Sequence, residues 1–469
     1  MTALAACKAG VQASPTIDQK VISSVVAATI NAASTATQRA ALTSHPPQIS
    51  TSTQAPTLAE TPLPSATSTV PPVPATPLPS TPEVMVAYTK YNDVYLWTPN
   101  LGITRLTDMH DVVSVHLSQD GALIAFKRQD PAEVTLQELW VVNTSGNPNS
   151  LQLVTSDDLA ALVPPDASSS ILGYGVLDFT WRPGTHQLAY STLILHEGPG
   201  FGPNHDLRLV DAATMQKTTL FDTGQGGMFY YSPDGSQIAL SNPESISLVN
   251  ADGNNLRRDV LTYPGVITYS EYEYHPHPIW SADSASLMVT IPPHDPLGDP
   301  TPLTGLWRIP ADGSPAVLLG SVPAIPFAWP DNAISPDLAL VAYSSDAIAP
   351  DPNIRDLHVS NLDGTGDRIY ANGESLEFNS WSPDSQHFIY AIQGGENEGL
   401  YIGSLDESPI VLIEDPHRVR DIQWQDDSSL IFLINNNDQW GLLLSNLDAD
   451  ILAFIDTIPD ASPDFDLKP

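Results

Sequence analysis

The chain has 469 residues, including 44 prolines and only 15% charged residues, a composition that favours a β-rich, loop-rich fold over one compact helical domain. Its 54 acidic residues outnumber its 18 basic residues and give a formal net charge of −36 at pH 7. A field of this sign repels phosphate backbones and anionic lipids, so it argues against nucleic-acid binding and favours cations or basic partners. An acidic surface that only keeps the protein soluble is the alternative explanation.

The N-terminal residues contain the only cysteine, Cys7, so no intramolecular disulfide can form. The run Leu4-Ala5-Ala6-Cys7 resembles a bacterial lipobox, in which a signal peptidase cuts before the cysteine and the cysteine then carries lipid. The resemblance implies lipidation of Cys7 and an extracytoplasmic, lipid-anchored protein of the bacterial cell envelope. Only six residues precede Cys7, without a basic region or a full apolar region, so either the gene begins upstream of Met1 or the match is accidental.

Residues 1–43 combine this lipobox-like run with a short helix, predicted from apolar residues at helical spacing such as Ile17, Val21 and Val25. The helix is too short and too polar to span a bilayer. Residues 44–83 are rich in Pro, Thr, Ser and Ala, a composition that builds no core and predicts a disordered stalk. Residues 1–83 carry three acidic and three basic side chains, so 51 acidic and 15 basic side chains follow Glu83. The whole net charge therefore belongs to the rest of the chain.

A repeat organises the sequence from about residue 84 onward. Its clearest copy is Trp381-Ser382-Pro383-Asp384, which is followed by the apolar run Phe388-Ile389-Tyr390. A close copy is Tyr231-Ser232-Pro233-Asp234-Gly235, which also leads into an apolar run. Proline presets φ near −65° and aspartate hydrogen-bonds its own backbone, so the motif predicts a tight turn between two strands. Each copy therefore indicates a β-hairpin.

The copies recur at intervals of 42 to 64 residues, each with four predicted strands. They are marked by Asp120, Gly184, Asp234, Asp283, Asp337, Asp384 and Asp426. A second family of turns recurs in a fixed position between the third and fourth strands, as at 250–253, 310–313 and 361–364. Periods of this size with four strands each are typical of propeller blades.

The repeat, with its Trp-Ser-Pro-Asp turn and strands such as Leu400-Tyr401-Ile402, closely resembles the WD-repeat-like propeller repeat of TolB and its relatives. The resemblance implies an all-β fold, a single propeller of four-stranded antiparallel blades over residues 84–457, with a tail at 458–469. The repeat count gives eight blades, with seven as the alternative. That family includes envelope accessory proteins, propeller domains of serine peptidases and some sugar lyases. The chain has no Gly-x-Ser-x-Gly motif, so the peptidase activity is set aside.

We expect the binding surface on one face of the propeller. Turns between first and second strands and between third and fourth strands share a face, and here those turns are short. The longer loops therefore gather on the other face, the loop face, where a rigid scaffold can present a binding site. They comprise residues 155–175, 196–205, 263–278, 292–303 and 345–353.

Histidines and carboxylates concentrate in three of these loops. The candidate ligand-binding residues are His196, His205, Glu271, Glu273 and Asp295. The candidate metal ligands are His275, His277 and His294, which flank the inner hairpin of one predicted blade. Neutral imidazoles beside carboxylates suit a divalent first-row metal ion. Surface histidines in a Pro-rich loop are the alternative interpretation.

Three functions are compatible with these features. The favoured one is a noncatalytic, monomeric scaffold that binds a protein, peptide or glycan at the loop face, without an assigned cofactor. The alternative is a metal-dependent, lyase-like enzyme that acts on polysaccharide, and the third is a structural spacer. Tryptophans at the ends of inner strands are predicted to pack between blades rather than to stack on a ligand. They are Trp181, Trp280, Trp381 and Trp424.

Overall fold

The structure is a computed structural model that describes residues 84–468 apart from 131–136, 146–147, 169, 198–200, 270–271, 299–302, 324–332, 347–353 and 437–438. The predictions for Cys7, the short helix and the stalk lie outside the described residues. Within the described part of the chain, no helix is long and apolar enough to cross a membrane.

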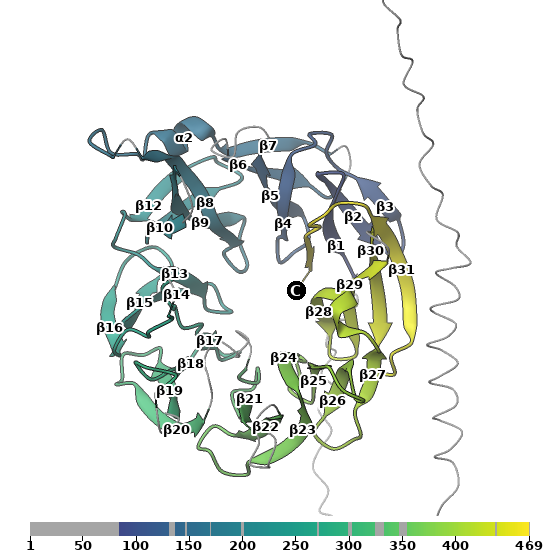
Figure 1. Cartoon of the computed structure of the whole chain (residues 1–469). Helices are drawn as coiled ribbons and strands as arrows, with labels where there is room; N and C mark the ends of the chain where they lie inside the picture. The colour runs from purple at the N-terminus through teal and green to yellow at the C-terminus, as the bar shows by residue number, and fades with distance from the viewer. Residues whose placement is uncertain are drawn as a thin grey trace, which may run out of the picture. The chain divides into compact units, whose positions relative to one another are not determined.

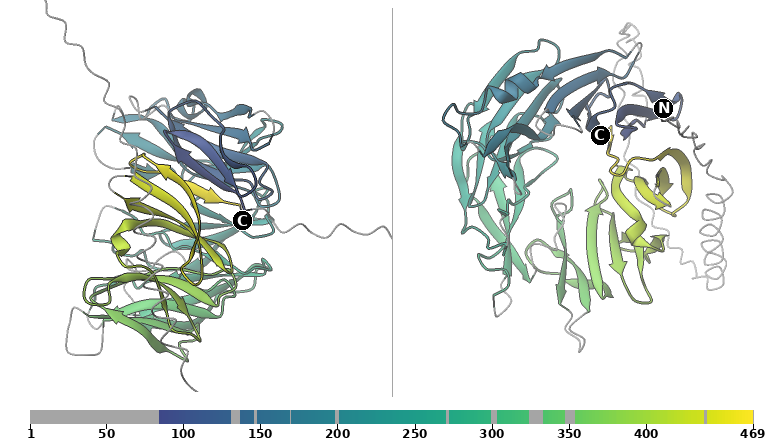
Figure 2. Two further views of the ribbon diagram at one scale, coloured as in Figure 1. Left: turned by 90° about the vertical axis from the view of Figure 1, so that its right-hand side faces the viewer. Right: turned by 45° about the horizontal axis from the view of Figure 1, so that its top comes forward.

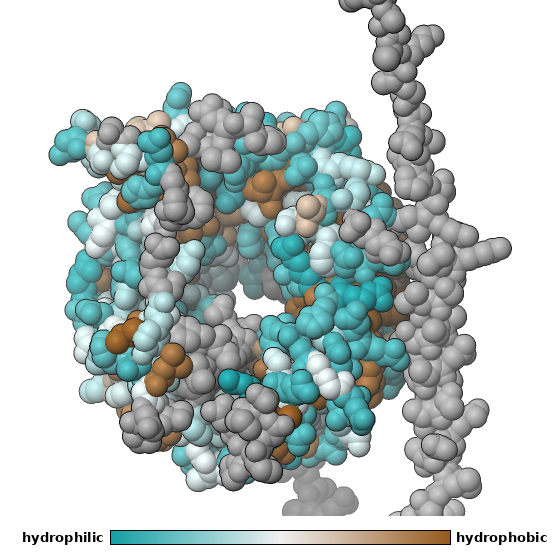
Figure 3. All heavy atoms as spheres, viewed as in Figure 1, coloured by the Kyte–Doolittle hydropathy of each residue, from teal (hydrophilic) through white to brown (hydrophobic). Residues whose placement is uncertain are grey.

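The described chain folds into eight antiparallel sheets arranged around a centre, which confirms the all-β propeller and its eight blades (Figure 1). The sheets are numbered here by their first strands in the chain. Six of them have four strands, the third has five, and the sixth has three among the described residues. The core lies between neighbouring sheets, while hydrophilic side chains predominate on the face seen in Figure 3.

Apart from β32 in the first sheet, the strands of the first four sheets follow one another along the chain. The first sheet contains β1 (Val86–Lys90), β2 (Asp93–Thr98), β3 (Gly102–Arg105) and β32 (Phe465–Leu467), and the second contains β4 (Val112–Leu117), β5 (Leu123–Gln129), β6 (Gln137–Asn143) and β7 (Ser150–Val154). The third contains β8 (Ile171–Trp181), β9 (Gln187–His196), β10 (Phe201–Pro203), β11 (Leu207–Asp211) and β12 (Lys217–Phe221). The fourth contains β13 (Met228–Tyr231), β14 (Gln237–Asn242), β15 (Ser245–Asn250) and β16 (Arg257–Thr262).

The last four sheets repeat the same order. The fifth contains β17 (Ile279–Trp280), β18 (Ser286–Ile291), β19 (Leu303–Pro310) and β20 (Val317–Pro323), and the sixth contains β21 (Leu340–Asp346), β22 (Arg355–Asn361) and β23 (Arg368–Gly373). The seventh contains β24 (Ser375–Trp381), β25 (His387–Gln393), β26 (Gly399–Ser404) and β27 (Ile410–Ile413). The eighth contains β28 (Val419–Asp426), β29 (Ser429–Asn436), β30 (Gln439–Asn446) and β31 (Ile451–Ile458). Two short helices, α2 (Ser156–Ala160) and the 3₁₀ helix η2 (Pro416–Arg418), lie in connecting segments.

The predicted tail at 458–469 contains the strand that closes the ring, so the propeller boundary at residue 457 is corrected. Strand β32 pairs antiparallel with β1 and becomes the innermost strand of the first sheet, with the C-terminal end beside it in Figure 2. Its apolar side chains, such as Phe465, join a core that also contains Tyr88 of β1 and Leu433 of β29. At the same seam, the Tyr88 hydroxyl donates a hydrogen bond of 2.7 Å to Asp456 of the last sheet.

The repeated Ser-Pro-Asp turn is held by its own side chains. In the fourth sheet the buried Ser232 hydroxyl donates to the Asp234 carboxylate over 2.7 Å and accepts from the Gln237 N–H over 3.0 Å. The hydrogen bond from Ser232 is the largest of several effects that lower the pKa of Asp234 to about 2. The same serine-to-aspartate bond recurs at Ser118, Ser281, Ser335 and Ser382. The motif therefore recurs because it satisfies the polar groups of each inner hairpin.

The tryptophans at the ends of β8, β17 and β24 connect their blades to the preceding ones, as expected. The Trp381 indole N–H donates to the Ala333 carbonyl over 3.0 Å, and the Trp280 indole donates to Tyr230 over 3.1 Å. Trp181 bonds to His116 in the same way, over 2.9 Å. Each indole thus fills the space between two sheets and pairs a backbone carbonyl of the neighbouring sheet.

Replacing Trp381 is expected to destabilise the whole ring, because its side chain is only 4% exposed. Trp381→Ala should lower the free energy of unfolding by about 3 to 5 kcal/mol through lost burial and a residual cavity. Trp381→Phe should lower the free energy of unfolding by less, since phenylalanine keeps an aromatic ring at this position. It loses the indole hydrogen bond and only part of the side-chain volume. Urea unfolding of both variants measures this effect, with Leu101→Ala, at an exposed position, as the control. A decrease in the free energy of unfolding below about 1 kcal/mol for Trp381→Ala would contradict the prediction.

The closing strand should protect backbone amides of the second sheet. Asp464 and Asp466 accept hydrogen bonds from the Val115 and Leu117 N–H groups of β4, over 2.9 and 2.6 Å. Phe465→Ala should loosen β32 and raise hydrogen exchange at these two amides by about tenfold or more, because local opening becomes less costly. Exchange measured by NMR or mass spectrometry checks the effect. Unchanged protection at both amides would show that β32 does not close the ring.

Candidate functional site

Loops from three successive sheets meet on the loop face. They are residue 205 between β10 and β11, residues 242–245 between β14 and β15, residues 263–278 between β16 and β17, and residues 292–298 after β18. The Ile267 N–H donates to the His294 carbonyl over 2.8 Å, and the Tyr263 N–H donates to the Glu244 carbonyl over 3.0 Å. Segment 263–278 is therefore fixed on both sides by its neighbours, and the two loops expected at one end of the fifth sheet do lie together.

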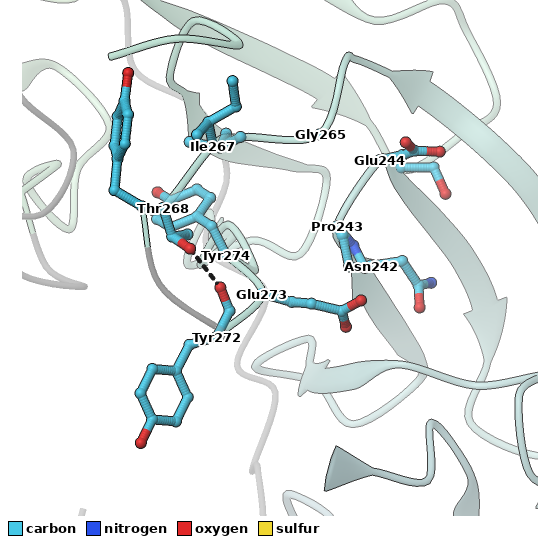
Figure 4. Close-up of a pocket in the computed structure, with 12 residues that line it drawn as sticks. Asn242, Pro243, Glu244, Gly265, Ile267, Thr268, Tyr272, Glu273 and Tyr274 are labelled. Atoms are coloured by element: carbon cyan, nitrogen blue, oxygen red, sulfur yellow. Dashed lines mark hydrogen bonds between the residues drawn. The ribbon is translucent and has the colours of Figure 1, made fainter. Parts of the chain in front are cut away.

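A pocket of about 880 Å³ opens beside this segment (Figure 4). Its wall combines aromatic and acidic side chains, and its described lining contains no Lys, Arg or His. The lining residues are Asn242, Pro243, Glu244, Ser245, Gly265, Val266, Ile267, Thr268, Tyr269, Tyr272, Glu273 and Tyr274. The pocket can therefore offer ring faces together with two carboxylates to a ligand.

Internal hydrogen bonds shape the tyrosine-rich wall. The Tyr269 hydroxyl donates to the Asp295 carboxylate over 2.6 Å, and this hydrogen bond raises the pKa of Tyr269. The Thr268 hydroxyl donates to the Tyr272 carbonyl over 2.7 Å, drawn as a dashed line in Figure 4. Tyr269 has φ of +54°, a left-handed conformation that costs free energy in a bulky residue. The wall is thus held in one arrangement by its neighbours, with Tyr269 and Tyr272 exposed to solvent.

Three of the predicted site residues converge next to the pocket. The ligand-type atoms of His205, Glu273 and His275 all lie within 4.8 Å of one another. The two imidazole rings are stacked, with centroids 5.3 Å apart and an interplanar angle of 28°. Glu273 lines the pocket as well, so it belongs to both features.

The other predicted residues do not join this group. The His277 ring packs edge-on against Tyr230 at 4.4 Å, and His294 Nδ1 donates to the Gly265 carbonyl. His196 is the last residue of β9, and Asp295 accepts the hydrogen bond from Tyr269. Glu271 lies outside the described residues. Among the described residues, therefore, His275 is grouped with His205 and Glu273 rather than with His277 and His294, which corrects the expected grouping.

A second group of metal-ligand type, Asp93, Asp108 and His110, has a structural explanation. The Arg105 guanidinium already bonds to both Asp93 and Asp108. Burial alone would raise the pKa of Asp93, but hydrogen bonds, led by that from the Met109 N–H, lower it. Arg105 thus offsets one of the two carboxylate charges and links β2, β3 and the segment after β3.

A serine, a histidine and an aspartate form a hydrogen-bonded chain in the sixth sheet. Ser345 Oγ lies 3.0 Å from His358 Nε2, and His358 Nδ1 lies 3.0 Å from Asp367. The His358 ring is buried and stacks on Tyr343 at 4.9 Å, and the Tyr343 hydroxyl also donates to Asp367. This series of hydrogen bonds links β21, β22 and the turn before β23. Its role is therefore explained by the stability of the sixth sheet.

Sequence reasoning missed the aromatic half of the site. Glu244, Tyr269, Tyr272 and Tyr274 were not singled out, although the run from Tyr269 to Tyr274 alternates tyrosine and glutamate closely enough to have been noticed. The Ser241 carbonyl, which accepts a hydrogen bond from His275 Nδ1 over 3.2 Å, gave no sequence signal, because any residue supplies a backbone carbonyl.

Comparison with known proteins adds structural likeness only. No family model and no curated protein matches the chain. Among solved structures, an oligogalacturonate lyase in complex with manganese is 17% identical, with 67% of this chain and 83% of that chain covered and a TM-score of 0.42. The β-propeller domain of the Trilobed protease from Pyrococcus furiosus is 14% identical, with 57% and 81% covered and a TM-score of 0.39. TolB from Acinetobacter baumannii is 13% identical, with 80% and 78% covered and a TM-score of 0.33.

The protein is an eight-bladed β-propeller, as its own sheet topology shows. TolB and other β-propellers are among its structural neighbours. With TM-scores below 0.5 and such low identities, these similarities carry no argument about ligand or activity.

Proposed function

We propose that the propeller is a noncatalytic binding scaffold that holds a protein or peptide ligand through a basic side chain in the pocket beside 263–278. The observation that carries the proposal is the lining itself, in which Tyr269, Tyr272 and Tyr274 stand with Glu244 and Glu273 and no described basic residue. Tyrosine ring faces and carboxylates both attract a Lys or Arg side chain. The net charge of −36 also attracts a basic partner over longer distances, before it contacts the pocket.

The exposure of the tyrosines supports a protein partner. Tyr269 is 61% exposed and Tyr272 is 70% exposed, on a segment that is hydrogen-bonded to neighbouring loops. Large aromatic side chains presented by a rigid frame are typical centres of binding energy at protein interfaces. An anionic sugar, by contrast, would meet two carboxylates in this pocket and no described cation. The described lining on its own therefore favours a basic side chain over an anionic sugar, a preference that a metal ion on Glu273 would weaken.

The proposal includes a tether to the cell envelope. Support comes from the Leu4-Ala5-Ala6-Cys7 run and from the Pro-rich composition of residues 44–83, which suits a spacer. A lipid on Cys7 would place the propeller outside the cytoplasm with its loops free to meet a partner. The tether and the pocket are separate parts of the proposal and are tested separately.

The pocket is tested with an array of lysine- and arginine-containing peptides, scored by fluorescence polarisation. Tyr272→Ala and Glu244→Gln should each weaken binding of a selected peptide by about tenfold, since each removes a contact with the basic group. Tyr91→Ala is the matched control, because Tyr91 is 55% exposed but lies in the first sheet, far along the chain from the pocket. Acetylation of the peptide lysine should weaken binding to a similar degree.

Two results would contradict this function. One is binding that survives both Tyr272→Ala and Glu244→Gln without change. The other is selective binding to oligosaccharides on a glycan array with no affinity for basic peptides. Either result removes the basic-peptide site.

The tether is tested by fractionating cells that express the natural gene. Cys7→Ser should move the protein from the membrane fraction to the soluble fraction and abolish incorporation of a labelled fatty acid, because a serine cannot carry the thioether lipid. Thr76→Ala, in the Pro-rich segment, should change neither result. Membrane association and labelling that persist in Cys7→Ser would show that the lipobox match is accidental.

A further inference from the structure

The cluster of His205, Glu273 and His275 gathers groups that are distant in the sequence. His205 comes from the third sheet, while Glu273 and His275 precede the first strand of the fifth. Glu273 Oε2 lies 3.6 Å from His205 Nε2 and 3.8 Å from His275 Nε2. His205 has φ of +47°, a conformation that is uncommon for a residue with a side chain. The ring geometry fixes this convergence, since each of the three residues belongs to a loop held by hydrogen bonds to its neighbours.

The orientation of His275 leaves one nitrogen available as a ligand. Its Nδ1 donates a hydrogen bond to the Ser241 carbonyl over 3.2 Å, which makes Nε2 the lone-pair nitrogen of the neutral ring. Ser241 is itself held in place, because its hydroxyl donates a hydrogen bond to the Pro276 carbonyl. A histidine oriented by a carbonyl on one nitrogen, with the other nitrogen left to bind the ion, is the usual arrangement of a metal ligand.

Two buried nitrogens of the cluster, His275 Nε2 and His205 Nδ1, have no hydrogen-bond partner among the described residues. Of the two, His275 Nε2 is the one that faces Glu273, because His205 turns its Nε2 toward that carboxylate. An unpaired buried polar atom costs free energy, and each such atom in a folded protein calls for an explanation. The His275 Nε2 lone pair also faces a carboxylate oxygen at 3.8 Å, and two acceptors at that distance repel unless a positive charge lies between them.

We propose that His205, Glu273 and His275 bind a divalent first-row metal ion, with zinc as the probe of choice. Two imidazoles and one carboxylate form a ligand set that suits zinc and its neighbours. Ligand atoms at about 2.1 Å from a tetrahedral zinc ion are about 3.4 Å apart. The two distances to Glu273, 3.6 and 3.8 Å, are close to that spacing, and all three ligand atoms lie within 4.8 Å of one another. The Asp93 cluster differs because Arg105 already supplies its positive charge.

The metal site goes beyond the proposed peptide binding, and the two sites have one residue in common. Glu273 is the shared residue, so a bound cation leaves Glu244 as the free carboxylate of the pocket. Tyr272 and Glu244 test the pocket, whereas His205 and His275 test the metal site. Failure of one proposal can thus be distinguished from failure of the other.

The test uses the full chain, purified without a histidine tag, stripped with a chelator and then titrated with Zn²⁺, Mn²⁺ or Mg²⁺. We expect about one equivalent of zinc by elemental analysis and a rise in Tm on zinc addition, because a ligand that binds only the folded state stabilises it. Mg²⁺ should bind far more weakly, since it prefers oxygen ligands. Absence of both zinc retention and a Tm shift overturns the proposal.

Variants locate the site. His205→Ala, His275→Ala and Glu273→Gln should each weaken zinc binding by at least about tenfold. His277→Ala and His294→Ala are the matched controls on the same loops and should bind zinc as the unaltered protein does. Glu273 has a side chain that is 59% exposed, so Glu273→Gln keeps the test decisive even if a histidine variant does not fold. Zinc binding unchanged in Glu273→Gln, or abolished by His277→Ala or His294→Ala, contradicts the assignment.

Discussion

The packing of each sheet against its two neighbours holds the ring together, and at three junctions a hydrogen bond from an inner-strand indole to the backbone of the preceding blade reinforces it. This hydrogen bond occurs at Trp181, Trp280 and Trp381, and each indole is also packed between two sheets. A four-stranded sheet has two apolar faces and cannot bury either alone, so its stability depends on both neighbours. Strand β32 extends this dependence around the ring, because it places the end of the chain in the first sheet and caps amides of the second.

A rigid ring determines where loops from different blades meet. His205 and His275 are 70 residues apart in the chain, yet their rings stack because the third, fourth and fifth sheets are consecutive in the ring. The described part of the pocket wall is joined to a neighbouring loop by the hydrogen bond from Tyr269 to Asp295. The same rigidity accounts for two strained residues, His205 and Tyr269, that keep left-handed backbone conformations.

The fold was predictable because its signal is local and repeated. Each Ser-Pro-Asp turn carries its own hydrogen bonds, so a motif such as Ser382-Pro383-Asp384 specifies a hairpin wherever it occurs. Strand β32 was missed because three residues without a turn motif, Phe465–Leu467, become a strand only by pairing with β1. The site was predicted by residue type but not by grouping. Whether His275 meets His205 or His277 depends on the spacing between blades, which no sequence pattern records.

The proposed cation on the loop face, between His205, Glu273 and His275, can be located in crystals of the full chain grown with Zn²⁺ and measured at wavelengths on both sides of the zinc absorption edge. We expect one strong anomalous peak at about 2.0 to 2.2 Å from the imidazole nitrogens and the carboxylate oxygen of these three residues. A peak at His277 or His294, or no peak at the cluster, would rule the site out.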